Sequence, residues 1–418
     1  MFAGVNLSIR ICKMFMKLQY IIPVLFLLDI ILAFNCPSPC VCQDNNTTVL
    51  CNRTGISDVP KDLPKNTITL DLGFNQIKSI AKNAFDGLTQ LKYLYLSGNQ
   101  FSANSFQNGA LNHSNIQVLE LSSGSYMTIP QGLPPNLSTL YFFDNPITTL
   151  TANSFVNATS IQYLEFRYNQ LKTLEDHAFD PLVNALEIDI SFNKLVDGSF
   201  SPMSFVKNQK LTNLEFRFNA LTTFPNMSYF PRTLQHIDFV GNHIKVIPSF
   251  AFKTLTNLQT IEVWEGAITT VEDNAFYGLN KLTYLDFMDD HVSSTISNLT
   301  FNGLTALQKL FFDGNNASKI EPGAFHSMKN IQELWFSSNK LSTLDPEVLD
   351  SKFIPNLSLL YIDFNPWICD CQLRWLREKM DSDPNVIQDP HLIVCSGPPT
   401  VAGKAWDVLT PKDFVCND

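Results

Sequence analysis

Apolar residues recur along this chain in one short pattern. Aligning the sequence on L-x-x-L-x-L-x-x-N-x-L gives thirteen copies, of which LKYLYLSGNQF and IQELWFSSNKL are typical. The copies follow one another at intervals of 21 to 26 residues, mostly 24. Such near-constant spacing predicts a solenoid in which each copy stacks on its neighbours. The asparagine position falls at Asn75, Asn99, Gly124, Asn145, Asn169, Asn193, Asn219, Asn242, Gly266, Asp290, Asn315, Asn339 and Asn365.

The centre of each copy predicts a short β-strand. The x-L-x-L-x segment alternates, so its leucines or phenylalanines point inward and its x residues outward. One strand per copy then stacks into a parallel sheet, and the asparagines lie where the chain turns and can bond adjacent turns. The row is broken at Gly266 and Asp290, either by ordinary repeat decay or because the loop beside Trp264 is irregular. The expected fold class is an α/β solenoid, a horseshoe with a concave parallel β-sheet and short helical or extended convex segments.

A second apolar position lies about ten residues past the asparagine. It is Ala-Phe in five copies, and these phenylalanines are expected to stack as a spine beneath the convex side: Phe85, Phe179, Phe252, Phe276 and Phe325. Core packing of this kind accounts for the 33 phenylalanines of the chain without any ligand. Three proline-rich connections instead predict an extended convex side: Pro60–Pro64, Pro130–Pro135 and Pro225–Pro231.

Cysteines occur in two groups of four, one before the first copy and one after the last. The groups are Cys36, Cys40, Cys42 and Cys51, and Cys369, Cys371, Cys395 and Cys416. A solenoid needs caps over its exposed ends, and even quartets in an exported chain predict two disulfides in each cap. Zinc binding at Cys369 and Cys371 is the competing interpretation, although C-x-C is not the usual zinc spacing. Spacing alone allows three pairings for each quartet.

These motifs together resemble the extracellular leucine-rich-repeat proteins with cysteine-rich caps. CPSPCVC before Cys51 resembles their N-terminal cap, and NPWICDCQLRWL resembles their C-terminal cap. The group includes Slit, the Nogo receptor, the lamprey lymphocyte receptors and Toll-type ectodomains, and the resemblance covers residues 36–418. It implies the bridges Cys36–Cys42, Cys40–Cys51, Cys369–Cys395 and Cys371–Cys416. It identifies an architecture that many functions share.

The chain begins with a segment that resembles an export signal. Three basic residues precede the apolar run Ile21–Phe34, which is too short to span a bilayer. We expect a signal peptide at residues 1–33, an N-terminal cap at 36–64, repeats at 65–364 and a C-terminal cap at 365–418. An uncleaved anchor is the alternative. Export also predicts glycosylation, with sequons off the outward strand positions, at Asn52, Asn112, Asn136, Asn157, Asn226, Asn298, Asn316 and Asn356.

Composition and charge narrow the function. The 418 residues are 45% hydrophobic, which excludes a disordered chain, and the net charge of −10 argues against a phosphate-binding surface for nucleic acid. There is no Gly-rich phosphate loop, HExxH or G-x-S-x-G motif. We therefore expect neither an enzyme nor a cofactor or metal site. A glycosidase-type carboxylate pair is conceivable, but an open sheet face offers no way to exclude water.

The outward strand positions predict a binding face. Six consecutive copies carry an acid there, and aromatic residues follow: Glu165, Asp189, Glu215, Asp238, Glu262 and Asp286, then Trp264, Phe311, Trp335 and Tyr361. Acids at this position are partly family consensus, and this alternative stays open. Six in a row on strands ~4.8 Å apart nevertheless repel one another by roughly 0.8 kcal/mol per pair in water. Exposed Trp and Tyr are typical of interface hot spots.

The sequence thus predicts a secreted binding protein. It is expected to hold an extracellular protein partner with a basic surface on the acidic and aromatic concave face, without nucleic acid or a membrane span in the mature chain. The alternatives are a self-associating matrix or adhesion component and a soluble immune receptor. The oligomeric state and the ligand stay open.

Overall fold

The computed structural model describes residues 36–102, 104–106, 109–111, 115–293 and 295–416. The expected signal segment 1–33 and the sequon at Asn112 lie outside the described residues. The chain divides into two compact units. The first reaches Ser125 and includes Pro130–Leu137, and the second contains Tyr126–Ile129 and everything from Ser138 onward.

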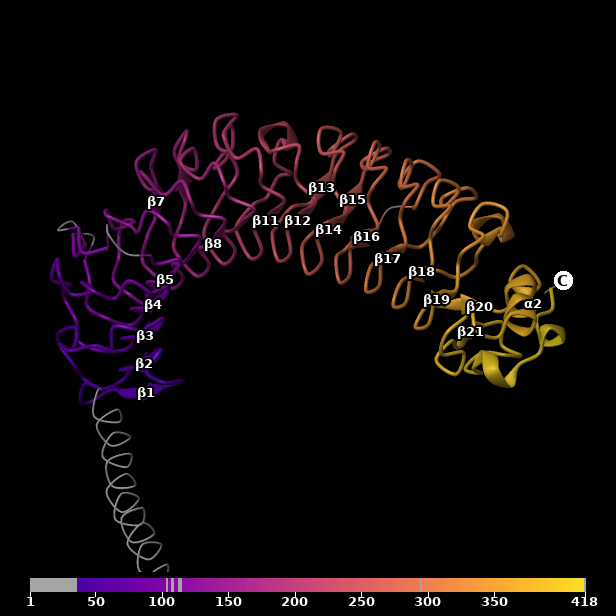
Figure 1. Cartoon of the computed structure of the whole chain (residues 1–418). Helices are drawn as coiled ribbons and strands as arrows, with labels where there is room; N and C mark the ends of the chain where they lie inside the picture. The colour runs from indigo at the N-terminus through magenta and orange to yellow at the C-terminus, as the bar shows by residue number, and fades with distance from the viewer. Residues whose placement is uncertain (1–35, 103, 107–108, 112–114, 294, 417–418) are drawn as a thin grey trace, which may run out of the picture. The chain divides into compact units, whose positions relative to one another are not determined.

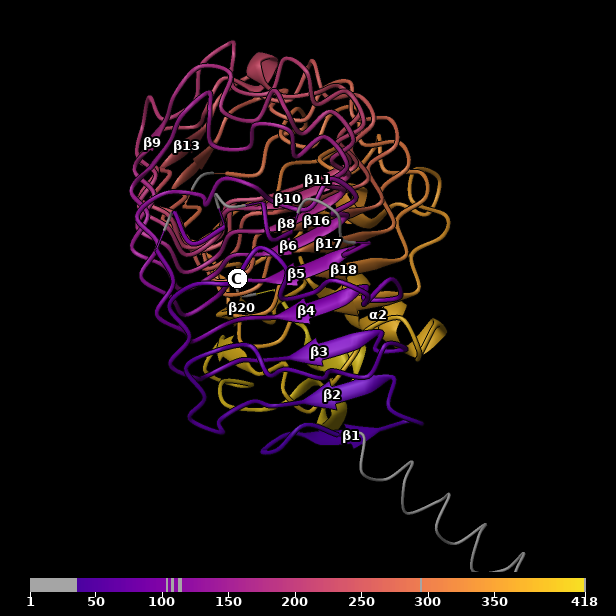
Figure 2. The same cartoon turned by 60° about the vertical axis from the view of Figure 1, so that its left-hand side comes forward.

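The first unit opens with an antiparallel pair of strands, β1 (Val41–Gln43) and β2 (Thr48–Leu50). Parallel strands β3 (Thr69–Asp71), β4 (Tyr93–Tyr95) and β5 (Val118–Glu120) follow, as Figure 2 shows. The inward leucines of β3 to β5 lie in register and are fully buried. Each strand has only three residues, of which the central one is buried, because the chain turns soon afterwards.

The second unit continues the same pattern with ten parallel strands. They are β6 (Thr139–Tyr141), β8 (Tyr163–Glu165), β10 (Glu187–Asp189), β11 (Asn213–Glu215), β12 (His236–Asp238), β14 (Thr260–Glu262), β16 (Tyr284–Asp286), β17 (Lys309–Phe311), β18 (Glu333–Trp335) and β19 (Leu359–Tyr361). Each of the thirteen predicted copies thus supplies one strand, three in the first unit and ten in the second. The predicted solenoid is confirmed.

The side of the second unit opposite the sheet is built mainly from turns (Figure 1). Two pairs of two-residue strands lie there: β7 (Thr149–Leu150) with β9 (Thr173–Leu174), and β13 (Val246–Ile247) with β15 (Thr270–Val271). Short 3-10 helices occur at η1 (Met227–Tyr229) and η2 (Pro346–Leu349). Asn226 and Asp345 each accept a hydrogen bond from the first turn of these helices, which fixes where they begin.

Phenylalanines stack through the core as the sequence predicts. Phe179 lies 6.1 Å from Phe155 and 5.2 Å from Phe205, measured between ring centroids, and Phe276 lies 5.8 Å from Phe252. These rings are fully buried or nearly so. Burying one such side chain stabilises the fold by about 1.5–3 kcal/mol, so the spine is a major source of cohesion between repeats.

The asparagine row bonds each turn to its neighbours. Asn193 is representative: its Nδ2 donates to Phe166 O and to Ile190 O, both at 3.0 Å, and its Oδ1 accepts from Leu171 N at 2.9 Å. Buried backbone groups at the turn are thereby satisfied, which is why an amide with both donors and an acceptor recurs there.

Asp290 occupies one position of this row and keeps only half of the asparagine role. Its Oδ1 accepts from Ile268 N at 3.1 Å, while its fully buried Oδ2 has no hydrogen-bond partner among the described residues. Burial raises the pKa of Asp290 to about 7. A Cβ at Gly266 would lie 2.8 Å from Asp290 Oδ1, so glycine leaves room for the carboxyl. Backbone pairing continues from Val263 and Glu265 to the next repeat, so the loop there is regular.

Disulfides close both ends of the chain. The bridges are Cys36–Cys42, Cys40–Cys51, Cys369–Cys395 and Cys371–Cys416, the pairings that the resemblance implies. All eight sulfurs are therefore used, and zinc binding at Cys369 and Cys371 is excluded.

The C-terminal end adds the parallel pair β20 (Trp367–Ile368) and β21 (Cys395–Gly397), helix α2 (Arg374–Ser382), and 3-10 helices η3 (Trp406–Val408) and η4 (Pro411–Asp413). Trp367 and Trp406 are fully buried in the core of this C-terminal cap. No helix in the described part of the chain is long and apolar enough to span a bilayer.

Candidate binding face

The ten predicted face residues all lie on the outward side of the second unit's sheet, between β8 and β19. Parallel register places the six acids in adjacent pairs, beginning with Glu165 beside Asp189 and ending with Glu262 beside Asp286. The same register places Phe311 beside Trp335 and Trp335 beside Tyr361. The structure therefore brings residues of successive repeats, 23 to 26 positions apart in the chain, side by side on one surface.

The three aspartates of the acidic row are buried, which corrects the expectation that all six acids face solvent. Asp189, Asp238 and Asp286 are 4%, 0% and 5% exposed. In each, Oδ1 accepts a hydrogen bond at 2.8–3.0 Å from the backbone N–H two residues later. The short aspartate side chain folds back onto its own strand, as in an Asx turn. Aspartate therefore recurs at this position for a structural reason. The longer glutamate side chains extend further from the strand.

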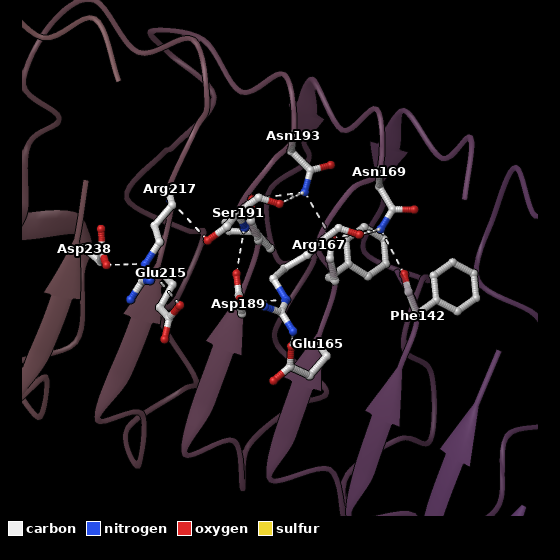
Figure 3. Close-up of polar contacts among 12 residues, drawn as sticks. Phe142, Glu165, Arg167, Asn169, Asp189, Ser191, Asn193, Glu215, Arg217 and Asp238 are labelled. Atoms are coloured by element: carbon white, nitrogen blue, oxygen red, sulfur yellow. Dashed lines mark hydrogen bonds and ion pairs between the residues drawn. The ribbon is translucent and has the colours of Figure 1, made fainter. Parts of the chain in front are cut away.

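Two arginines neutralise the middle of the acidic row (Figure 3). Arg167 pairs with Glu165 at 3.0 Å and with Asp189 at 3.2 Å. Arg217 contacts Asp238 and lies 3.6 Å from Glu215 and 4.0 Å from Glu262. Each guanidinium thus bridges acids of neighbouring strands, and five of the six acids have a cation within 4.0 Å.

Burial further reduces negative charge at the centre of the row. It raises the pKa of Glu215 and of Asp238 to about 7, against the opposing effect of Arg217. Burial also raises the pKa of Glu165, whereas it lowers the pKa of His236 beside them. The centre is therefore a partly protonated, paired network near neutral pH, and a weaker source of field than six free carboxylates.

Uncompensated acids lie instead toward the C-terminal strands. Among the described residues, none of the following takes part in an ion pair within 4.0 Å: Glu265, Asp286, Asp289, Asp313 and Asp363. Glu265 and Asp289 are exposed at the loop edge of β14 and β16. Glu333, on β18, is paired with Lys309 at 2.9 Å. Burial, reinforced by Asp363, raises the pKa of Asp313 to about 7.

A continuous aromatic row runs across β16 to β19. Ring centroids are 5.2 Å apart for Tyr284 and Phe311, 5.3 Å for Phe311 and Trp335, and 3.6 Å for Trp335 and Tyr361, which are stacked. All four side chains are half-buried, and Trp335 Nε1 has no hydrogen-bond partner among the described residues. Trp264 is not part of these ring contacts; its Nε1 donates to Glu262 Oε2 at 3.4 Å.

Tyr284 is a member of this row that sequence reasoning missed. It occupies the outward position two residues before Asp286, and its hydroxyl donates to Asp286 Oδ2 at 3.1 Å. Reading both outward positions of every strand, and not only the central one, would have found it. We call Tyr284, Phe311, Trp335 and Tyr361 the aromatic row.

A second set of aromatic residues at the loop edge was also missed. Tyr168, Phe192 and Phe218 each precede a row asparagine and have positive φ near 50°. Their centroids are 4.4 and 4.6 Å apart, and Phe218 lies over Gly241, where a Cβ would approach its ring to 2.3 Å. The sequence feature that could have revealed this set is an aromatic residue directly before the row asparagine in three successive copies.

One sequon departs from its expected place. Cys51 N and Arg53 N bond Asp71 O and Gly73 O, so the strand pattern continues past β2 and Asn52 takes an outward position beside Gly73. It is exposed there, just past the end of β2. The other described sequons in the predicted set are also exposed and lie outside the strands: Asn136, Asn157, Asn226, Asn298, Asn316 and Asn356.

Two family models match this chain. The model of the BspA type leucine-rich repeat region matches residues 222–352 with six copies, and a leucine-rich-repeat model matches residues 49–101 and 135–195. Together they cover more than half of the chain.

Curated relatives are matched over part of their length. Osteomodulin of Rattus norvegicus is 25% identical over 58% of this chain and 51% of its own. Lumican of Rattus norvegicus is 32% identical over 34% of this chain and 42% of its own, and podocan of Mus musculus is 30% identical over 33% and 23%. The chain spans about half or less of the length of these relatives.

Solved structures share the fold. A chain of the TLR13–ssRNA13 complex superposes with a TM-score of 0.68 at 26% identity, covering 80% of this chain and 48% of that one. A chain of the octameric complex of Latrophilin 3, Unc5D and FLRT2 gives 0.59 at 23% identity, covering 91% and 99%. The glycosylated Toll–Spatzle complex gives 0.68 at 20% identity, covering 86% and 54%.

Proposed function

Because this chain belongs to the leucine-rich-repeat family, we propose that it is a secreted extracellular binding protein that holds a protein partner on its sheet face. Its curated relatives osteomodulin, podocan and lumican are extracellular matrix proteins, and the four disulfides fit an oxidising compartment. An open sheet face with half-buried aromatic side chains offers a large contact area for a partner, which suits binding better than catalysis.

The observation that carries the proposal is the coincidence of the aromatic row with the uncompensated acids. Tyr284, Phe311, Trp335 and Tyr361 span β16 to β19. The exposed acids Glu265 and Asp289, which form no ion pair with any described residue, lie at the loop edge of β14 and β16. The partner is expected to be basic, because such acids attract positive charge over a Debye length and speed encounter. The aromatic side chains supply the buried contact that slows dissociation.

The paired acids Glu165, Asp189, Glu215 and Asp238 have a smaller part in this proposal than the sequence suggested. Their charge is offset by Arg167 and Arg217, so they shape the face and contribute little to long-range attraction. Glu262 and Trp264 lie between this paired centre and the aromatic row, and they complete the proposed contact surface.

Self-association through the same face is the second candidate function. It is favoured by the ring of Tyr168 at the loop edge, which is 53% exposed. Sedimentation of the purified chain distinguishes the two, because a dimer that dissociates on Trp335→Ala supports self-association and a monomer supports partner binding.

The test is affinity capture from extracellular fluid with four forms of the secreted chain as bait. These are the wild type, Trp335→Ala, the pair Glu265→Gln and Asp289→Asn, and Tyr277→Ala, a matched aromatic control that is 51% exposed away from the sheet. Association kinetics of the captured protein are then measured at low and high salt.

We expect Trp335→Ala to speed dissociation about thirtyfold, as for a hot spot worth roughly 2 kcal/mol. The acid pair should slow association several-fold at low salt and flatten its salt dependence, while Tyr277→Ala should behave as wild type. Unchanged kinetics in both face variants would show that the partner binds elsewhere.

A further inference from the structure

His236, Asp238 and Glu262 meet in the middle of the sheet face. His236 and Asp238 are alternate residues of β12 and point to the same side, and β12 pairs with β14 so that Asp238 lies beside Glu262. One imidazole nitrogen and one oxygen from each carboxylate lie within 4.8 Å of one another. This is the composition of a three-ligand metal site, which the sequence analysis did not expect.

We propose that these three side chains bind a divalent transition-metal ion, with Zn²⁺ as the best fit. Imidazole together with carboxylates suits this class of ion better than Ca²⁺ or Mg²⁺, which prefer oxygen alone. A tetrahedral ion at about 2.1 Å from each ligand places the ligand atoms roughly 3.4 Å apart. The side chains have to close by at most about 1.4 Å from their present separation.

Asp238 is the anchor of the site. Its side chain is fully buried, and Oδ1 is fixed by the N–H of Val240 at 2.8 Å. Oδ2 accepts no hydrogen bond from any described residue, although it is shielded from water. The nearest group to Oδ2 is Arg217 Nε, with which it forms an ion pair. A buried, oriented oxygen of this kind is suited to a cation.

Arg217 competes with the metal for this position. Its guanidinium contacts Asp238 (Figure 3). It also lies 4.0 Å from Glu262, so an ion at the site has to displace it. The arginine side chain is 34% exposed and lies 3.6 Å from Glu215, which offers it a second partner when it withdraws. The site therefore exchanges one cation for another, and three protein ligands leave a fourth metal position open to a ligand atom from outside.

A matched arrangement without histidine lies two strands earlier. Arg167 bridges Glu165 and Asp189 just as Arg217 bridges its acids, but the residue of β10 that corresponds to His236 is Glu187. Removal of this second arginine frees similar carboxylates and supplies no imidazole, so it separates metal chelation from general attraction to acids.

The experiment is calorimetric titration of Zn²⁺ into the tag-free, secreted full chain and four variants, with circular dichroism to check each fold. Arg217→Gln should tighten binding at least tenfold, because it removes the competing cation. His236→Gln should weaken binding at least tenfold, and Arg167→Gln and His243→Gln should leave it unchanged. Co²⁺ should give the intense visible absorption of a tetrahedral site in the Arg217→Gln chain and not in His236→Gln.

The proposal is overturned if Arg217→Gln binds no tighter than wild type, or if His236→Gln binds as tightly. Equal tightening by Arg167→Gln also overturns it, since the effect would then be one of charge alone. His236 is half-buried, and its side chain forms no hydrogen bond with any described residue, so its replacement should leave the fold intact for the measurement.

Discussion

Replacing Asp290 with asparagine should stabilise the protein, and increasingly so as pH rises. The carboxyl lies where an asparagine amide would donate to backbone carbonyls, and its Oδ2 has no partner among the described residues unless it carries a proton. Burial holds the pKa of Asp290 at about 7 against 3.8 for the free side chain. The unfolded chain therefore loses this proton at a lower pH than the folded chain does.

The size and sign of the effect of Asp290 on the free energy of unfolding follow from this difference in pKa. One pKa unit corresponds to about 1.4 kcal/mol, so the shift from 3.8 to about 7 amounts to about 4 kcal/mol. A raised folded-state pKa gives a stabilisation that is complete below the unfolded value and disappears as pH rises through about 7. Asp290→Asn removes this dependence, so its advantage should be small near pH 4 and reach up to about 4 kcal/mol above about pH 8.

Urea unfolding of both chains at several pH values, followed by tryptophan fluorescence, measures this directly. The difference between the two chains isolates Asp290, because other buried acids such as Asp313 titrate in both. Ser125→Asn, a change at an unrelated position, serves as a control for the added amide. A difference in unfolding free energy that does not change with pH, or an asparagine chain that is less stable at high pH, would refute the reasoning.

Three further changes test the packing of the solenoid. Asn193→Ala should lower the unfolding free energy by about 2–4 kcal/mol, because it leaves buried backbone carbonyls unpaired, and chemical denaturation measures the loss. Gly241→Ala should lower the melting temperature, since its Cβ meets the Phe218 ring at 2.3 Å, and Phe218→Asn in the same chain should restore part of it. Converting Cys371 and Cys416 to serine should cost about 2–4 kcal/mol, whereas mass spectrometry of the wild type should find neither thiol free.

The periodic pattern determined the fold. A strand of alternating residues every 24 positions has one way to bury its leucines, which is to stack on its neighbours in parallel. The positions of the strands, the phenylalanine spine and the asparagine row all followed from this constraint. The sequence also predicted the cap disulfides. Their pairing required the resemblance to known caps, because four cysteines allow three connectivities.

The sequence predicted which residues lie on the candidate face, but it did not predict their burial and charge. The sequence assigned Glu165, Glu215 and Trp335 to the outward side correctly, since a period of two fixes the side of the sheet. It did not show that Asp189 and Asp238 fold back onto their own backbone. A carboxyl one methylene shorter than glutamate reaches the N–H two residues on, and side-chain length decided burial there.

What only the tertiary structure decided is which side chains meet across strands, and in what state of charge. Arg167 and Arg217 lie two residues after the acids of their own strands, but they pair with acids of the next strand about 21 to 22 positions away. The same stacking brings His236 to Glu262 and encloses Asp290 where water cannot solvate its charge. Sequence spacing determines the side on which a residue lies, whereas burial and cross-strand distance depend on rotamers and on neighbours that are remote in the chain.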